Sequence, residues 1–459
     1  MVLHKICLTF VFAYFIIYLM ERNALIKLKD WQTQVTRLPL ILRGARQVGK
    51  TWLLKAFGRE CFQHTAYINF EANRSIHKLF ASDLSIDKLL LGLRVETKAK
   101  IEPGKTLIIF DEIQECPGAL TALKYFAEEA PQYHVAAAGS LLGVALHAGT
   151  SFPVGKVQFL DLAPLSFLEF IAALGEAELG RIVMNEDWQM VEAFRLRLME
   201  LLGYYLCVGG MPEVVNNFRE HSDLDDVREI QNRLLTAYEQ DFSKYAKTDI
   251  VPRIRAVWQS IPAQLSREQK KFVYGLIREG ARAREYETAI EWLCDAGLAH
   301  KVWRVVKPGL PLRSYRELNH FKLYFLDVGL LSAHMGVPPR AILDGDRLFT
   351  EYKGALTEQY VCQELSLQDI FNVAYWSADN ARSEVDFLIQ YDTAIIPLEV
   401  KSAENLQAKS LKVYRDKFSP PVCLRTSLSG YRQETWLTNL PLYALQRIRK
   451  ELVERIVCG

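Results

Sequence analysis

Short apolar runs that end in polar or glycine-rich stretches recur through the first third of the chain. One run spans Leu38 to Leu42, a second spans Leu107 to Phe110, and the stretch YHVAAAGS forms a third that ends at Ser140. Runs of this length, bounded by loop-forming residues, are typical of buried parallel strands. Helical spacing follows the first run, so the pattern predicts an α/β fold.

The loop after the first run reads GARQVGKT, from Gly44 to Thr51. This is the phosphate-binding spacing G-x-x-x-x-G-K-[ST], in the strand, loop and helix order that the motif requires. Loop amides and the helix N-terminus hold negative charge, Lys50 reaches the β- and γ-phosphates, and the Thr51 hydroxyl binds Mg²⁺. We therefore predict a site for ATP and Mg²⁺ in this loop. Its residues are Gly44, Gln47, Val48, Gly49, Lys50 and Thr51.

Two further strand ends complete this predicted site. Asp111 and Glu112 follow the second run, where a carboxylate suits the water shell of Mg²⁺, so Asp111 joins Thr51 as a predicted metal-binding residue. Glu112 is then placed to polarise the attacking water. Ser140 follows the third run and is a candidate contact of the γ-phosphate or the water, with a plain strand-to-helix turn as the alternative. The set predicts ATP hydrolysis, with Lys50, Glu112 and Ser140 as catalytic residues.

The middle of the chain, residues 166–335, has mainly helical spacing and is expected to form a lid. Residues 264–309 read as helix, turn, helix and strand pair, with 283–296 as the second helix, which fits a winged helix. Basic residues gather in this segment, and they indicate either a solvated face or contact with a nucleic-acid backbone. These residues are Lys270, Lys271, Arg278, Arg282 and Arg284.

The last third combines an amphipathic helix at 354–365 with strands that carry charged residues. VAYWSA, SEVDFLIQY and AIIPLEVKS read as three strands, the last two joined by a turn at residues 391–393. Residues i and i+2 of a strand share a face, so Glu399 and Lys401 point the same way. If the hairpin register places Asp386 opposite Glu399, the two carboxylates can bind one Mg²⁺.

These charged residues have two interpretations. A metal held by Asp386 and Glu399 would polarise a phosphodiester and activate water, while Lys401 orients that water or stabilises the developing charge. Glu358, on the preceding helix, is then a further candidate ligand. In the alternative, the same residues are polar positions on ordinary strands, and the domain binds a partner without cleaving anything.

The series of motifs resembles a prokaryotic family of AAA-type P-loop ATPases that carry a C-terminal domain of unknown function numbered 4143. The matching stretches run in order from RGARQVGKT and IIFDEIQ through CVGGMPEVV and FKLYFLDVGLL to GALTEQYV, EVDFLI and PLEVKS. The resemblance implies an AAA-type core over residues 20–165 and a helical lid with a winged helix over 166–335. It also implies an α/β domain like PD-(D/E)XK nucleases and restriction endonucleases over 350–430, with 431–459 as a tail. The implied nuclease-like residues are Glu358, Asp386, Glu399 and Lys401.

Composition limits the class of protein without naming a partner. The chain has 459 residues, of which 50% are hydrophobic and 24% charged, and its formal net charge is +2. These values are ordinary for a globular protein of several domains and lack the strong positive field of a protein built around nucleic acid. The eight cysteines show no C-x-x-C spacing, which favours free thiols and a cytoplasmic location.

Residues 1–19 form an apolar extension that is short for a membrane span of ~20 residues. Translation starting at Met20, a membrane anchor and a helix buried in the fold are the three interpretations.

Three functional hypotheses follow from the sequence. The first is an ATP-hydrolysing switch or motor coupled to a nuclease-like domain that acts on nucleic acid. The second is a switch whose C-terminal domain is catalytically silent and docks a protein or DNA. The third is a membrane-anchored ATPase, and a homo-oligomer is a candidate assembly because AAA-type sites often borrow charge from a neighbour.

Overall fold

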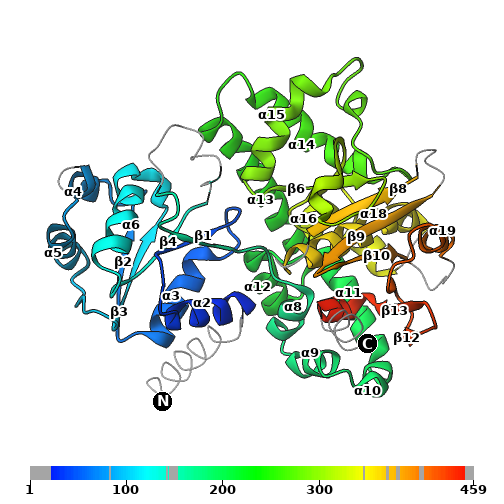
Figure 1. Cartoon of the computed structure of the whole chain (residues 1–459), viewed down its shortest axis with the longest axis horizontal. Helices are drawn as coiled ribbons and strands as arrows, with labels where there is room; N and C mark the ends of the chain where they lie inside the picture. The colour runs from blue at the N-terminus through cyan, green and yellow to red at the C-terminus, as the bar shows by residue number, and fades with distance from the viewer. Residues whose placement is uncertain are drawn as a thin grey trace. The chain divides into compact units, whose positions relative to one another are not determined.

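The computed structural model divides the chain into two compact units (Figure 1). The N-terminal unit comprises residues 21–164 and 291–298, and the C-terminal unit comprises residues 165–290 and 299–459. The predicted extension at 1–19 lies outside the described residues. Within the described part of the chain, no helix is both long and apolar enough to cross a membrane. The described residues are 22–449, except for 82–83, 141–142, 144–152, 345–346, 369–371, 379–382 and 403–407.

The N-terminal unit is built on a parallel sheet with the strand order β2, β3, β4, β1, β5. The predicted α/β class and parallel sheet are therefore confirmed. The strands are β1 (Leu40–Arg43), β2 (His64–Asn69), β3 (Thr106–Asp111), β4 (His134–Ala138) and β5 (Gln158–Asp161). The helices are α2 (Asn23–Thr33), α3 (Lys50–Cys61), η2 (Arg74–Ile76), α4 (His77–Ala81), α5 (Ile86–Thr97), η3 (Ile113–Glu115) and α6 (Pro117–Glu129).

The apolar runs of the sequence form the buried centre of this unit. β3 and β4 are buried along their whole length, as expected for strands covered on both faces. One face packs on α4, α5 and α6, and phenylalanine rings within this core make edge-to-face contacts with centroids 5.3–6.3 Å apart. Because the strands are parallel, their carboxyl ends meet at one edge, and Gly44, Asp111 and Ser140 lie there at the ends of β1, β3 and β4.

Helices dominate the first part of the C-terminal unit, in line with the helical spacing of the sequence. α8 begins with a capping box, in which Ser166 and Glu169 each accept a hydrogen bond from the other's backbone amide. The turn at Gly209 and Gly210, in the stretch CVGGMPEVV, is held inside this unit, because the Gly210 amide donates to the buried Asp327 carboxylate at 2.7 Å. The helices are α8 (Phe167–Ala173), α9 (Ala177–Met184), α10 (Trp188–Ala193), α11 (Arg195–Val208), α12 (Pro212–His221), α13 (Leu224–Tyr245), α14 (Val251–Leu265), α16 (Val328–His334) and α17 (Pro339–Asp344).

The predicted winged helix is not confirmed. α14 ends at Leu265, and residues 266–282, all of them described, hold the 3₁₀ turn η5 (Tyr274–Leu276) in place of an α-helix. Gly275 and Gly280 disfavour a helix in this stretch. α15 (Ala283–Asp295) forms as predicted. The strand pair β6 (Ala299–Val305) and β7 (Arg316–Phe325) also forms, but β6 pairs with β8 (Asn372–Ser377) on its other side. The pair is therefore part of a larger sheet.

That mixed sheet has the order β12, β13, β11, β10, β9, β8, β6, β7. It crosses the boundaries expected at residues 335 and 430, because β6 and β7 come from the segment assigned to the lid and β13 from the segment assigned to the tail. Strand partners this far apart in sequence are decided by sheet hydrogen bonding, which a local pattern does not reveal. The remaining strands are β9 (Glu384–Tyr391), β10 (Ala394–Val400), β11 (Cys423–Ser427), β12 (Arg432–Gln433) and β13 (Leu437–Pro441). The remaining helices are η6 (Leu312–Tyr315), α18 (Arg347–Ser366), α19 (Lys409–Phe418) and η7 (Leu442–Arg447).

The predicted β9–β10 hairpin forms. It turns through Asp392 and Thr393, and Asp392 adopts a left-handed φ of 47° that aspartate tolerates in tight turns. The antiparallel register runs to the pair of Leu398 with Phe387, and one further step in the same register would set Glu399 opposite Asp386. The register condition on which the predicted carboxylate pair depended is therefore met.

Candidate functional site

The loop between β1 and α3 has the backbone of a phosphate cradle. Gly44, Gln47 and Gly49 have φ values of 142°, 64° and 95°, which turn successive amides toward one side of the loop. A Cβ on Gly44 would lie 2.1 Å from the carbonyl oxygen of Leu162, so glycine is required there. α3 begins at Lys50, and its N-terminus adds a partial positive charge to the cradle.

Lys50 lies inside this loop with only 5% of its surface exposed. Its Nζ donates to the carbonyl oxygens of Gly44 at 2.8 Å and Ala45 at 2.7 Å. Burial lowers the pKa of Lys50 to about 8, although the nearby Glu112 and Asp111 oppose that shift. The ammonium is thus held at the centre of the cradle. A bound phosphate would place negative charge beside it and favour the charged form of Lys50, which burial disfavours.

Thr51 and Asp111 lie side by side, as the sequence predicts for a magnesium site. The Thr51 hydroxyl lies 3.1 and 3.0 Å from the two carboxylate oxygens of Asp111, which is 3% exposed at the end of β3. A hydroxyl and a carboxylate that converge next to a phosphate cradle are hard oxygen donors of the kind Mg²⁺ prefers. The two residues therefore fit the metal that the loop motif implies.

Two residues of β2 complete this group and were missed from the sequence. Tyr67 donates its hydroxyl to Asp111 Oδ2 at 2.7 Å, and the Asn69 side-chain amide donates to the same oxygen at 3.3 Å. Burial and this hydrogen bond raise the pKa of Tyr67 to about 12. The parallel register sets Asn69 opposite Asp111. The i, i+2 spacing of Tyr67 and Asn69 at the end of a strand was the available signal.

Glu112 is held from two sides. The Ser140 hydroxyl donates to Glu112 Oε1 at 3.0 Å, and the Gln114 side-chain amide donates to Oε2 at 2.6 Å. Glu112 itself adopts a left-handed φ of 49° just after β3. The structure therefore brings the predicted catalytic residues Glu112 and Ser140 into direct contact, and it adds Gln114, which the sequence reasoning left out.

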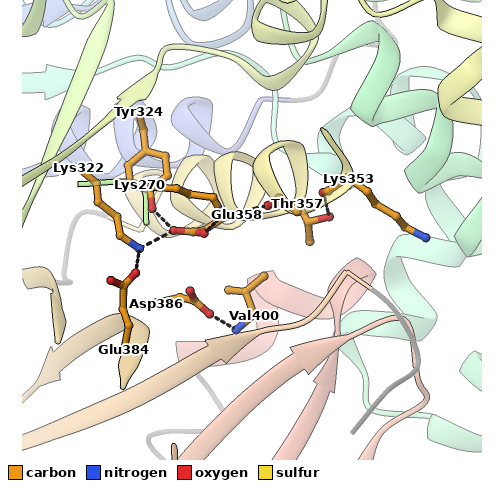
Figure 2. A network of polar contacts seen from close by, with 10 residues as sticks. Lys270, Lys322, Tyr324, Lys353, Thr357, Glu358, Glu384, Asp386 and Val400 are labelled. Carbon is orange, nitrogen blue, oxygen red and sulfur yellow. Dashed lines mark hydrogen bonds and ion pairs between the residues drawn. The ribbon is translucent and has the colours of Figure 1, made fainter. Parts of the chain in front are cut away.

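A second group of charged residues lies in the C-terminal unit, centred on Glu358 of α18 (Figure 2). Glu358 is 3% exposed, and its Oε1 accepts from Lys322 Nζ at 2.8 Å and from the Tyr324 hydroxyl. Its Oε2 accepts from Lys270 Nζ. Burial favours the neutral acid, but the two ammonium groups outweigh it and lower the pKa of Glu358 to about 2. Glu358 is therefore a carboxylate already matched by positive charge.

Lys322 of β7 is the most enclosed member of this group. Its side chain is fully buried, and its Nζ contacts Glu384 Oε1 at 2.6 Å as well as Glu358. Figure 2 shows its ammonium between those two carboxylates. Burial lowers the pKa of Lys322, but Glu358, Glu384 and Asp386 together outweigh burial and raise it well above the ordinary lysine value.

The predicted pair on the hairpin has different partners. Asp386 Oδ2 accepts from the Val400 amide at 2.7 Å, and Lys401 Nζ donates to Glu399 Oε1 at 2.6 Å. Glu399 is 5% exposed, and its Oε2 is buried without a hydrogen-bond partner. Burial, followed by the charges of Glu358 and Glu399, raises the pKa of Asp386 to about 8. Burial also raises the pKa of Glu399.

The metal predicted at Asp386 and Glu399 lacks its candidate third ligand in this arrangement. In the described part of the chain, no group of three or more His, Cys, Asp or Glu side chains is arranged to hold a metal ion. Both carboxylate oxygens of the candidate third ligand, Glu358, already accept hydrogen bonds, from Lys322, Tyr324 and Lys270.

Four residues of this group were missed from the sequence. Lys322 and Tyr324 stand two apart in the apolar stretch FKLYFLDVGLL, so a shared strand face was the available signal. Lys270 was assigned to a solvated or DNA-contacting basic face, but its side chain is only 13% exposed and pairs with Glu358. Glu384 precedes Asp386 by two on β9, and nothing in the sequence set it apart from surface charges.

The fold and the loop geometry define an AAA-type P-loop ATPase-like domain in the N-terminal unit. Residues 36–171 match a family described as an AAA domain. Residues 199–341 match a domain of unknown function, DUF8612, and residues 353–445 match the domain of unknown function DUF4143. The AAA-type core and the DUF4143 domain predicted from the motifs are thereby confirmed. No curated protein matches the chain.

Several solved structures are similar to the chain at low identity. A Walker-type ATPase of Pyrococcus abyssi is 16% identical, with a TM-score of 0.44, over 69% of this chain and 95% of that one. The ORC1 protein of Aeropyrum pernix in complex with DNA is 15% identical, with a TM-score of 0.27, over 70% of this chain and 92% of that one. Cdc6p from Pyrobaculum aerophilum is 13% identical, with a TM-score of 0.25, over 72% of this chain and 96% of that one.

Proposed function

We propose that this protein is a Mg²⁺-dependent ATPase that works as a nucleotide-driven switch. The observation that carries the proposal is the convergence of the loop and strand-end residues at the carboxyl edge of the parallel sheet. Thr51 lies 3.0 Å from Asp111, and Ser140 lies 3.0 Å from Glu112. Lys50 lies close enough to both carboxylates for their charges to act on its pKa.

Each side chain has a distinct part in the proposed reaction. Lys50 leaves the loop carbonyls to neutralise the β- and γ-phosphates, and Glu112 takes up a position to polarise the attacking water. Thr51 and Asp111 would hold Mg²⁺, which offsets phosphate charge when bound. Ser140 and Gln114 fix the orientation of the Glu112 carboxylate through its two oxygens.

ATP binding and turnover by the full-length protein test this proposal. Lys50→Ala is expected to lose both, because the cradle then lacks its cation. Glu112→Gln keeps the shape of the site and is expected to bind ATP while turnover falls by about 10²-fold or more. Lys124→Ala, an exposed lysine of α6, is the matched control and should behave as the wild type. Equal turnover by Lys50→Ala and the wild type would refute the proposal.

The C-terminal unit is the proposed output of the switch, and two roles for it compete. Coupling to nucleic-acid cleavage needs a metal centre at Glu358, Asp386 and Glu399, whereas docking of a protein or DNA does not. The pairing of Glu358 with two lysines supports docking. We propose DNA as the partner, contacted through two exposed arginines, Arg282 just before α15 and Arg284 in its first turn.

Labelled duplex DNA tests this partner. Binding by fluorescence anisotropy should weaken with salt and on the double substitution of Arg282 and Arg284 by alanine. Light scattering with and without ATP tests a homo-oligomer in the same samples. No detectable DNA binding would favour a protein partner, and DNA binding that does not depend on these two arginines would refute the proposed contact.

A further inference from the structure

The buried charges of the C-terminal unit come from segments far apart in the sequence. Lys270 follows α14, Lys322 and Tyr324 lie on β7, Glu358 on α18, and Glu384 on β9. We call these five residues the charge cluster. Every contact within it joins two different elements, so the charge cluster ties the edge of the mixed sheet to the helix beside it (Figure 2).

A metal centre needs carboxylate oxygens whose lone pairs are free to face one point. In the charge cluster, both oxygens of Glu358 accept hydrogen bonds, and Glu384 Oε1 forms an ion pair with the Lys322 ammonium. The ammonium that fills the space between Glu358 and Glu384 is fully buried. A divalent cation beside it would meet an unscreened like charge, and the low polarity of the interior strengthens that repulsion.

Lys322 supplies the positive charge that a bound cation would otherwise supply to these buried carboxylates. It lies between two carboxylates, 2.8 Å from Glu358 and 2.6 Å from Glu384, and the charge of a third, Asp386, also acts on it. It is tethered to β7, so the positive charge cannot dissociate. Buried carboxylates need such compensation, because an uncompensated charge in the interior is strongly destabilising.

We infer that the ammonium of Lys322 takes the place of a divalent cation among the carboxylates of the C-terminal unit. The charge cluster is thus a metal-independent lock between α18 and the sheet, and the C-terminal unit does not cleave nucleic acid at this site. This inference is independent of ATP hydrolysis in the N-terminal unit.

Metal binding by the nucleotide-free, full-length protein tests the inference. Mn²⁺ is titrated and followed by electron paramagnetic resonance, and thermal unfolding is measured with and without the metal. The wild type is expected to show no Mn²⁺ binding that depends on Asp386 or Glu399, so Asp386→Asn and Glu399→Gln leave its titration unchanged. Mn²⁺ should change the melting temperature of the wild type and of the two variants by nearly the same amount, with a difference of less than about 1 °C.

Lys322→Met removes the tethered cation while keeping the length of the side chain. This variant is expected to melt at a lower temperature than the wild type. It is also expected to bind Mn²⁺ at least about tenfold more tightly than the wild type does. Adding Asp386→Asn to it should abolish the gain. Lys412→Met, an exposed lysine of α19, makes the same charge change and is the matched control, which should gain nothing.

Two outcomes of the Mn²⁺ titrations would overturn the inference. One is Mn²⁺ binding by the wild type that Asp386→Asn or Glu399→Gln removes. The other is a folded Lys322→Met variant that binds Mn²⁺ no better than the Lys412→Met control. If Lys322→Met does not fold, the wild-type titration still decides. Plasmid nicking adds a third readout, and cleavage lost in both Asp386→Ala and Lys401→Ala would also contradict the inference.

Discussion

Replacing Glu358 by glutamine perturbs the centre of the charge cluster with almost no change in shape. The carboxylate of Glu358 accepts from Lys322, Tyr324 and Lys270. In Glu358→Gln the amide oxygen can still accept from Tyr324, but Lys270 loses its charged partner. Lys322 retains Glu384 at 2.6 Å.

The expected loss of stability follows from the pKa of Glu358. The folded protein lowers this pKa from the ordinary 4.5 to about 2. One unit of pKa corresponds to about 1.4 kcal/mol, so the ionised group stabilises the fold by about 3 kcal/mol. Breaking a buried ion pair by removing one partner costs a similar ~3–5 kcal/mol. We therefore expect the free energy of unfolding to fall by about 3 kcal/mol.

Urea unfolding of the full-length protein measures this loss, through the transition in which the C-terminal unit unfolds. The folded pKa is depressed, so the contribution of Glu358 is fully present above pH 4.5 and is lost as the pH falls toward about 2. The gap between wild type and variant should therefore narrow from pH 6 to pH 3. Glu178→Gln, an exposed glutamate paired with Arg181, is the control and should change stability by about 0.5 kcal/mol or less. A gap at pH 6 no larger than that of the control would refute the reasoning.

Three further predictions concern single side chains. Asp386→Asn should stabilise the protein at pH 8–9 and have little effect at pH 4 in urea unfolding. The raised pKa of about 8 makes the wild type lose stability as the pH rises from 3.8 to 8. Tyr67→Phe removes a hydrogen bond to Asp111 worth about 1 kcal/mol, so ATPase kcat should fall about fivefold and need more Mg²⁺, with KM for ATP little changed. Gly44→Ala places a Cβ 2.1 Å from the Leu162 carbonyl, so ATP binding measured by calorimetry should be lost.

Each of these has a result that would contradict it. Equal pH dependence of stability in Asp386→Asn and the wild type would show that this carboxyl titrates normally. Unchanged kcat of Tyr67→Phe at every Mg²⁺ concentration would remove Tyr67 from the magnesium site. Normal ATP affinity of Gly44→Ala would mean that the loop does not need the observed backbone.

The ATP site was readable from the sequence because its determinants are local. The phosphate-binding loop is one contiguous stretch, Gly44 to Thr51, and the apolar strands before the loop and before Asp111 indicate a parallel sheet. In a parallel sheet, strand ends meet at one edge, so the order of motifs also predicts that Asp111, Glu112 and Ser140 approach the loop. Tyr67 and Asn69 were not predicted as residues of this site because the end of their strand carries no recognisable motif.

The charge cluster was decided by tertiary structure. The hairpin, its turn and the shared face of Glu399 and Lys401 follow from the sequence alone, since they depend on alternation over a few residues. The sequence could not determine that β7 and Lys270 reach α18, because contacts between segments this far apart in sequence depend on how the sheet is assembled. An ion pair also needs two partners, and a sequence pattern does not reveal which distant residue will be the partner of a given charged residue. The motif suggested a metal at Asp386 and Glu399, and only the folded chain shows Lys322 between the carboxylates of Glu358 and Glu384.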